Sequence, residues 1–297
     1  MPSRLLACLV ALLCAVATAG CGGDELAGLE RDARDTAEEL RDSAERVRER
    51  AERLRERAER LADRIRETLA DIRRSVPSAS LEQPTSEGRT QAGGRVADYL
   101  TEVLESVDTY WSRTLRAAGQ PEPRVGYVWV PPGARLGTEC GAVADDAAAF
   151  YCPASDTIYV AEVFAERVWR GVADEFPGTQ AGAGRAVGDF GLAYVVAHEY
   201  AHNLQQELGF FSLRPGRGNA AFELQADCMA GVWGNSVYRA GQLQPGDVEE
   251  AVSTALAVGD FEFGSAGHHG TPTERRDAWL LGFRDGQPSD CSRFVPT

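Results

Sequence analysis

Apolar residues recur at helical spacing in several separate stretches of the chain, and the longest stretch comes first. Between residues 24 and 76, two apolar rows repeat every seven residues with an offset of three, which is the a and d pattern of a coiled coil. The rows are Leu26, Ala33, Leu40, Val47, Leu54 and Leu61, and Ala37, Ala44, Ala51, Ala58, Ile65 and Ile72. The pattern predicts a long charged stalk, either paired with a second copy as a homodimer or standing alone as a solvated helix.

The segments on both sides of this predicted helix differ from it in amino-acid composition. Residues 1–21 combine Arg4 with an apolar run that is too short to span a bilayer, which is typical of an export signal. The run ends in Thr18-Ala19-Gly20-Cys21, which resembles a bacterial lipobox with Cys21 as the lipidated residue, although Leu is usual where Thr18 stands. Residues 77–94 are rich in Pro, Ser and Gly and predict a flexible linker.

These flanking segments predict where the protein is located. Lipidation of Cys21 would anchor the chain to the cell membrane on its extracytoplasmic side. Cleavage by ordinary signal peptidase after Ala17 or Ala19 would instead give a secreted protein. In both cases the C-terminal domain is exported to a compartment in which disulfides persist.

From residue 95 onward the pattern is that of a folded, mostly helical domain. Helices are predicted over 95–115, 162–175, 188–208, 219–238, 247–258 and 273–283, and strands over 124–130 and 157–160. Asn219 and Thr273 are the predicted N-caps of two of these helices. The predicted fold is therefore α+β, a mainly helical domain with a small sheet. The predicted segments are 1–21, 22–76, 77–94 and 95–297.

Composition narrows the range of partners. The chain has 297 residues and 43% hydrophobic content, which suits one or two globular domains. Its formal net charge is −14, and its pI is about 4.8. This charge argues against nucleic acid and anionic lipid surfaces as partners.

The cysteines fall into two groups. Cys8, Cys14 and Cys21 lie within the export signal, and four more lie in the C-terminal domain. An even number in an exported domain predicts two disulfides. Cys140 and Cys152 bracket a short loop and are the expected first pair, which leaves Cys228 to pair with Cys291. Buried thiols or soft metal ligands are the alternative, but the spacings match no zinc-ribbon pattern.

The chemistry centres on the helix predicted over 188–208, where residues 198–202 read H-E-x-x-H. His198 and His202 are four positions apart on one helical face, so both imidazoles can bind one zinc ion at about 2.0–2.1 Å. Glu199 can accept a proton from zinc-bound water and pass it to a leaving amine. The alternative is a pair of surface histidines without a metal. The chain has only four histidines, and two of them fall in this motif.

Two neutral donors hold zinc loosely, so a third ligand is required. Glu223 and Asp227 share one face of the helix predicted over 219–238. Glu223 would complete a His2Glu site with an open fourth position for water. Asp227 would accept the second N–H of a ligand histidine and fix its tautomer.

With these motifs in place, the domain resembles the bacterial putative neutral zinc metallopeptidase family over roughly residues 95–297. The resemblance rests on residues 150–154, 193–202, 223–233 and 269–276. It implies a zincin-like fold for this domain. It also implies His198, His202 and Glu223 as zinc ligands and Glu199 as the base, in a site similar in logic to that of thermolysin-like gluzincins. It says little about the substrate.

The predicted function is therefore that of a membrane-anchored, extracytoplasmic zinc peptidase acting on peptide or protein substrates. One rival hypothesis is a catalytically silent envelope lipoprotein with a vestigial metal site, acting through its stalk. The intact Glu199 argues against that rival, because a purely structural site needs no base. Another rival is a metal-dependent hydrolase of a non-peptide amide, such as a cell-wall crosslink, and the sequence does not separate it from a peptidase.

The mechanism also calls for a hydrogen-bond donor opposite the base, aimed at the developing oxyanion. The glycine-flanked loop 264–270 carries His269, the first choice for this donor, and His268, the second. Tyr200 points away from the ligand face and is a poorer candidate. The structural alternative is that His269 hydrogen-bonds its own loop or Asp277.

Overall fold

The structure is a computed structural model that describes residues 23–75, 96–212, 219–263, 265 and 267–295. The predicted export signal with Cys21 and the predicted linker 77–94 lie outside the described residues. None of the helices that the structure describes has the length and hydropathy needed to cross a bilayer. The assignments of residues 1–21 and 77–94 stay predictions.

The long N-terminal helix is α2, Gly23–Ser75. The chain divides into two compact units after residue 57. In the first unit, Leu40, Val47 and Leu54 of one apolar row of α2 are exposed. In the second unit Ala62 and Ile65 are buried. Pairing of the exposed row with a second copy stays a prediction, as do the domain boundaries.

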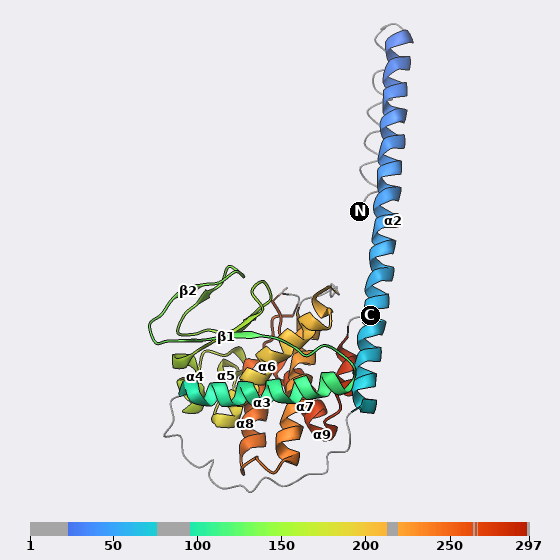
Figure 1. Cartoon of the computed structure of the whole chain (residues 1–297). Helices are drawn as coiled ribbons and strands as arrows, with labels where there is room; N and C mark the ends of the chain where they lie inside the picture. Colours follow the sequence, from blue (N-terminus) through green and yellow to red (C-terminus); the bar gives the residue numbers. More distant parts are fainter. Residues whose placement is uncertain (1–22, 76–95, 213–218, 264, 266, 296–297) are drawn as a thin grey trace. The chain divides into compact units, whose positions relative to one another are not determined.

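The second unit holds the other elements, which are mostly helical (Figure 1). Its helices are α3 (Val96–Ala117), α4 (Glu162–Trp169), α5 (Pro177–Gln180), α6 (Asp189–Glu207), α7 (Ala220–Arg239), α8 (Asp247–Val258) and α9 (Pro272–Asp285), with 3-10 helices η1 (Phe210–Ser212) and η2 (Pro288–Phe294). Its strands are β1 (Gly126–Val130), β2 (Leu136–Gly137), β3 (Val143–Ala144), β4 (Ala149–Cys152) and β5 (Thr157–Ala161). This is the mainly helical α+β arrangement that the sequence predicts.

The main sheet has the strand order β1-β5-β4. β1 runs parallel to β5 with Val128 opposite Tyr159, and β4 runs antiparallel to β5 with Tyr151 opposite Ile158. β2 and β3 form a separate antiparallel pair. The sequence predicted the strands that became β1 and β5 but missed β4, because four consecutive apolar residues show no alternation. As a result, β4, one of the two edge strands of the described sheet, appears only in the structure.

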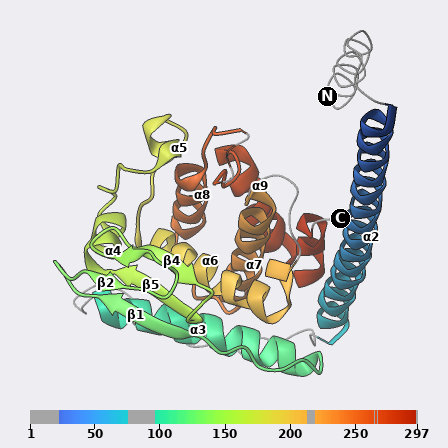
Figure 2. The same ribbon diagram turned by 90° about the horizontal axis from the view of Figure 1, so that it is seen from above.

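Helix α6 lies at the centre of the second unit. It contacts β4 on one side and α7 and α8 on the other (Figure 2). Most of its residues are consequently buried, as expected for a helix enclosed by other elements. Its first turn is held by α8, because the Phe190 N–H donates to Glu250 Oε2 at 3.0 Å. The motif of residues 198–202 therefore sits on a firmly packed element.

The prediction of a helix over 162–175 is wrong at its C-terminal end. α4 ends at Trp169, and Gly171 adopts a positive φ of 65°. A left-handed residue ends the helical hydrogen-bond ladder, and glycine adopts that conformation at little cost. The segment between α4 and α6, for which the sequence predicted no helix, contains the short helix α5.

The predicted caps of the two later helices also need correction. α9 begins at Pro272, so its N-cap is Thr271 and Thr273 lies inside the first turn. The Thr271 side chain accepts from the Glu274 N–H and the Glu274 side chain accepts from the Thr271 N–H, which is a capping box. Asn219 occupies the N-cap position of α7, but its side chain makes no capping hydrogen bond.

Both predicted disulfides are present in the structure. Cys140–Cys152 ties the loop after β2 to the end of β4. Cys228–Cys291 ties α7 to η2 across 63 positions of the chain. The first disulfide therefore restrains the edge strand, and the second restrains the helix that carries Glu223 and Asp227.

We expect the longer disulfide to contribute more to stability. Replacing Cys228 and Cys291 together with Ala should lower the free energy of unfolding by about 4 kcal/mol, and replacing Cys140 and Cys152 by about 3 kcal/mol. The reason is that a longer closed loop removes more entropy from the unfolded chain. Urea unfolding of the two double variants and the wild type measures both values. A smaller loss for the Cys228–Cys291 pair than for the other pair would contradict this expectation.

Candidate metal centre

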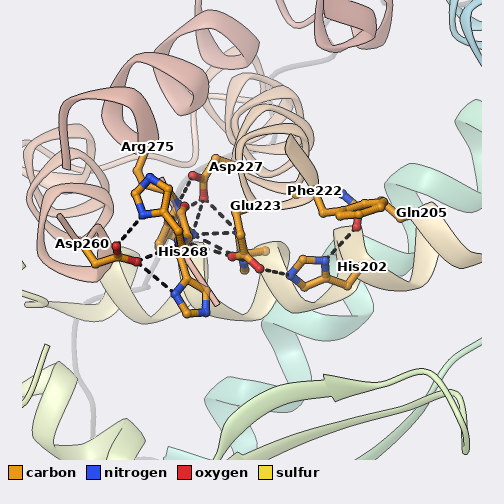
Figure 3. A network of polar contacts seen from close by, with 11 residues as sticks. His202, Gln205, Phe222, Glu223, Asp227, Asp260, His268 and Arg275 are labelled. Carbon is orange, nitrogen blue, oxygen red and sulfur yellow. Dashed lines mark hydrogen bonds and ion pairs between the residues drawn. The ribbon is translucent and has the colours of Figure 1, made fainter. Parts of the chain in front are cut away.

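Helices α6 and α7 bring three predicted ligands together. Donor atoms of His198, His202 and Glu223 all lie within 4.8 Å of one another. His198 Nε2 is 3.2 Å from Glu223 Oε2, and His202 Nε2 is 3.7 Å from Glu223 Oε1 (Figure 3). Two atoms bound at about 2.0–2.1 Å to a tetrahedral ion are about 3.3 Å apart. The separations and the nitrogen and oxygen donors therefore fit a zinc ion.

The other ring nitrogen of each histidine has its own partner. His198 Nδ1 lies 2.9 Å from Asp227 Oδ1, and His202 Nδ1 lies 2.8 Å from Gln205 Oε1. Gln205 in turn donates through Nε2 to the Phe222 carbonyl and to Gln225 Oε1. Because the oxygens beside Nδ1 accept hydrogen bonds, Nδ1 carries the proton in both rings. In the neutral form of each ring, Nε2 is therefore the nitrogen with the free lone pair, and it faces the three-residue group.

Charge is distributed unevenly over these side chains. Burial by itself lowers the pKa of His198, but the neighbouring Asp227 and Glu223 raise it to about 9. Burial lowers the pKa of His202 to about 4, and Glu223 opposes this only in part. Burial raises the pKa of Glu223, but His198 and His202 hold it well below its usual range. Metal binding at this group would therefore displace a proton from His198.

Glu199 lies beside the group on α6 and is almost fully buried. Burial raises its pKa to about 7, the charge of Glu223 adds to the shift, and the charge of His198 opposes it. The backbone N–H of Tyr151 donates to the Glu199 carboxylate and also opposes the shift. Tyr151 belongs to β4, so the strand that the sequence analysis missed contacts Glu199, the predicted base. A carboxyl group with a pKa near neutrality suits general acid–base work.

Arg275 is the main site residue that the sequence analysis missed. Its side chain is only 3% exposed and pairs with both Asp227 and Glu223. Tyr194 completes the arrangement by donating its hydroxyl to Asp227 Oδ1 at 2.6 Å. A signal was present for two of the missed residues. Arg275 lies within the motif at 269–276, and Gln205 lies three positions after His202 on the same helical face.

The structure places His268 and His269 around Asp260 of their own loop. His268 Nδ1 is 2.5 Å from Asp260 Oδ1 (Figure 3), and His269 Nδ1 is 3.2 Å from Asp260 Oδ2. The structural alternative from the sequence was that His269 hydrogen-bonds its own loop or Asp277. The pairing with Asp260 matches the first of these, because Asp260 lies in the same loop. Tyr200 donates its hydroxyl to Asp108 Oδ1. A catalytic role for His269 stays a prediction.

A second acidic group lies at the start of α6. Carboxylate oxygens of Asp189, Asp247 and Glu250 also lie within 4.8 Å of one another. The Phe190 N–H donates to Glu250 and Asp189, and burial together with mutual repulsion raises the pKa of Asp247 and Glu250. We assign this group a structural role in fixing the first turn of α6.

Comparison with known proteins places the chain in a family. Residues 66–294 match the sequence profile of the family described as "Putative neutral zinc metallopeptidase". The chain belongs to this family. The resemblance drawn from its motifs is thereby confirmed.

Two bacterial proteins are similar to the chain over about two thirds of its length. It is 32% identical over 218 residues to "Uncharacterized protein YpfJ" of Escherichia coli (strain K12), covering 67% of this chain and 71% of the relative. It is 30% identical over 214 residues to "Uncharacterized protein Rv2575" of Mycobacterium tuberculosis (strain ATCC 25618 / H37Rv), covering 64% and 67%. No solved structure matches the chain significantly. Membership points to Zn2+ as the metal and to hydrolysis as the class of reaction.

Proposed function

We propose that this protein is a zinc-dependent peptidase that hydrolyses peptide bonds outside the cytoplasm. The observation that carries the proposal is the convergence of His198, His202 and Glu223 with the buried Glu199 beside them. A structural metal site has no use for an adjacent carboxyl group with a pKa near neutrality. Membership of a zinc metallopeptidase family supports the same conclusion.

Each side chain then has a defined role. A zinc ion held by His198, His202 and Glu223 would polarise a scissile carbonyl and lower the pKa of a bound water. Glu199 accepts the proton of the attacking water and returns it to the nitrogen of the departing amine. Burial, which raises the pKa of Glu199, favours uptake of that proton. Asp227 and Gln205 keep the two imidazoles in the ligating tautomer.

The position of β4 favours an extended peptide as the substrate. β4 pairs with β5 on one side and forms one of the two edges of the described sheet. At its other side the Tyr151 N–H reaches Glu199. An extended segment can add to a sheet edge through main-chain hydrogen bonds. A peptide that adds along β4 would therefore run past the proposed base.

Metal removal tests the proposal. We expect the full-length protein, held in detergent, to contain about one zinc per chain and to cleave members of a mixed peptide library. Cleavage should disappear after dialysis against a chelator and return when one equivalent of zinc is added, because the attacking water depends on the metal. Mass spectrometry of the peptides and metal analysis of the protein give the two readouts. Cleavage that survives complete removal of zinc would contradict the proposal.

We also propose that the enzyme is anchored to the membrane through a lipid on Cys21. The lipobox-like stretch of residues 18–21 supports this proposal. Wild-type protein should then fractionate with membranes, and Cys21→Ser should be released or remain unprocessed. The matched control is Cys14→Ser, which changes a cysteine inside the signal. An unmodified mature N-terminus at Thr18 or Gly20, read by mass spectrometry, would instead indicate a secreted enzyme.

A further inference from the structure

We propose that Arg275 is a positioning residue of the metal centre, which fixes Asp227 and, through Asp227, the imidazole of His198. The inference rests on the proposed function, because it assumes that His198 binds the metal. Arg275 is 3% exposed. Its guanidinium is therefore closed off from substrate. Besides Asp227 and Glu223, it contacts the His198 ring at 3.4 Å, the Tyr194 hydroxyl at 3.3 Å and the His269 carbonyl at 3.5 Å.

The guanidinium engages Asp227 with two of its nitrogens. Nε donates to Oδ2, and Nη2 donates to Oδ1 at 3.0 Å. A two-point contact of this kind prevents the carboxylate from rotating. Oδ1 of the same carboxylate lies 2.9 Å from His198 Nδ1 and accepts the Tyr194 hydroxyl at 2.6 Å. The orientation of the His198 ring thus depends on a carboxylate that Arg275 holds.

The backbone around Arg275 explains how its side chain reaches α7. Arg275 follows the capping box of Thr271 and Glu274, which fixes the first turn of α9. α7 and α9 pack very closely. A Cβ atom at Gly282 would lie 1.9 Å from the Cys228 carbonyl oxygen, and one at Gly231 would lie 2.1 Å from the Trp279 carbonyl oxygen. Only glycine fits at these positions, so the distance between the two helices is set by backbone contact.

Charge gives Arg275 a second effect on the site. Asp227 is fully buried, and Glu223 lies one helical turn before it on α7. The guanidinium contacts the two carboxylates unequally. It reaches only one oxygen of Glu223, with Nη1 3.3 Å from Oε2, whereas it donates to both oxygens of Asp227. Without Arg275 the buried Asp227 charge would lack its cationic partner, which is costly. Arg275 therefore compensates the Asp227 carboxylate and holds it within hydrogen-bond distance of His198, while Glu223 supplies the carboxylate for the metal.

Zinc affinity measured on the full-length protein tests this role. Competition with a chromophoric chelator should give a zinc Kd about 10–100-fold weaker for Arg275→Met than for wild type, the usual effect of removing a partner of a ligand. Arg275→Lys should fall between the two, because an ammonium keeps the charge but cannot hold both oxygens. The absorption bands of the Co2+-substituted protein should shift in both variants, since they report ligand geometry. Arg276→Met is the matched control and should leave the Kd unchanged, because Arg276 pairs only with its neighbour Asp277 in the described contacts.

The outcomes separate this inference from the proposed function. If wild type fails to bind zinc, the metal site itself is wrong. If wild type binds zinc and folded Arg275→Met binds it within twofold, with unchanged Co2+ bands, only the role of Arg275 is wrong. Thermal unfolding of the metal-free proteins shows which variants fold. If Arg275→Met does not fold, two other variants test the role of Arg275 by their zinc affinity. One is Arg275→Lys. The other combines Arg275→Met with Asp227→Leu and so leaves no unpaired buried charge. Wild-type zinc affinity in either of these variants would overturn the inference.

Discussion

Replacing Glu199 with Gln is expected to lower the kcat of peptide cleavage by about 10²–10⁴-fold while zinc stays bound. Gln has nearly the same shape as Glu and can still accept the Tyr151 N–H that reaches this position. It cannot take a proton from water, so the step that depends on proton transfer is lost. The three proposed ligands are untouched, and the zinc content should therefore equal that of wild type.

A matched control separates the loss of the base from a general effect on the helix. Glu207→Gln makes the same change at an exposed position of α6 and should leave kcat unchanged. Kinetics on one peptide identified from a library, together with zinc analysis, provide the comparison. A Glu199→Gln variant with wild-type kcat would remove Glu199 from the mechanism.

Replacing His202 with Ala is expected to weaken zinc binding by at least about 100-fold, because loss of a direct ligand exceeds the 10–100-fold cost of losing an outer partner. His202 Nε2 is one of the three donor atoms that converge within 4.8 Å. With it gone, His198 and Glu223 leave only two donors, and peptide cleavage should disappear together with the metal. Chelator competition measures the affinity, and metal analysis measures the zinc retained after gel filtration.

The control for this variant is another histidine. His268 pairs with Asp260 and lies outside the group formed by His198, His202 and Glu223 among the described residues. His268→Ala should therefore retain one zinc with wild-type affinity. If His202→Ala binds zinc as tightly as His268→Ala does, the ligand set is wrong.

The sequence alone determined those parts of the site that depend on helical spacing. His198 and His202 share a face because they are four positions apart, and so do Glu223 and Asp227. The mainly helical α+β class followed from periodicity in the same way, since α3 buries the apolar face that its spacing predicts. The two disulfides followed from the number and spacing of four cysteines.

Only the tertiary structure decided the contacts between elements. Arg275 reaches Asp227 across 48 positions, and Gln205 reaches Gln225 across 20. The contact of Tyr151 with Glu199 likewise joins separate elements, and the pairing of His269 with Asp260 depends on how the loop between α8 and α9 folds back on itself. Such contacts depend on how closely helices and strands pack, as the glycine contacts between α7 and α9 illustrate. Helical period specifies which face of an element is apolar, but the packing of that face specifies which side chains meet.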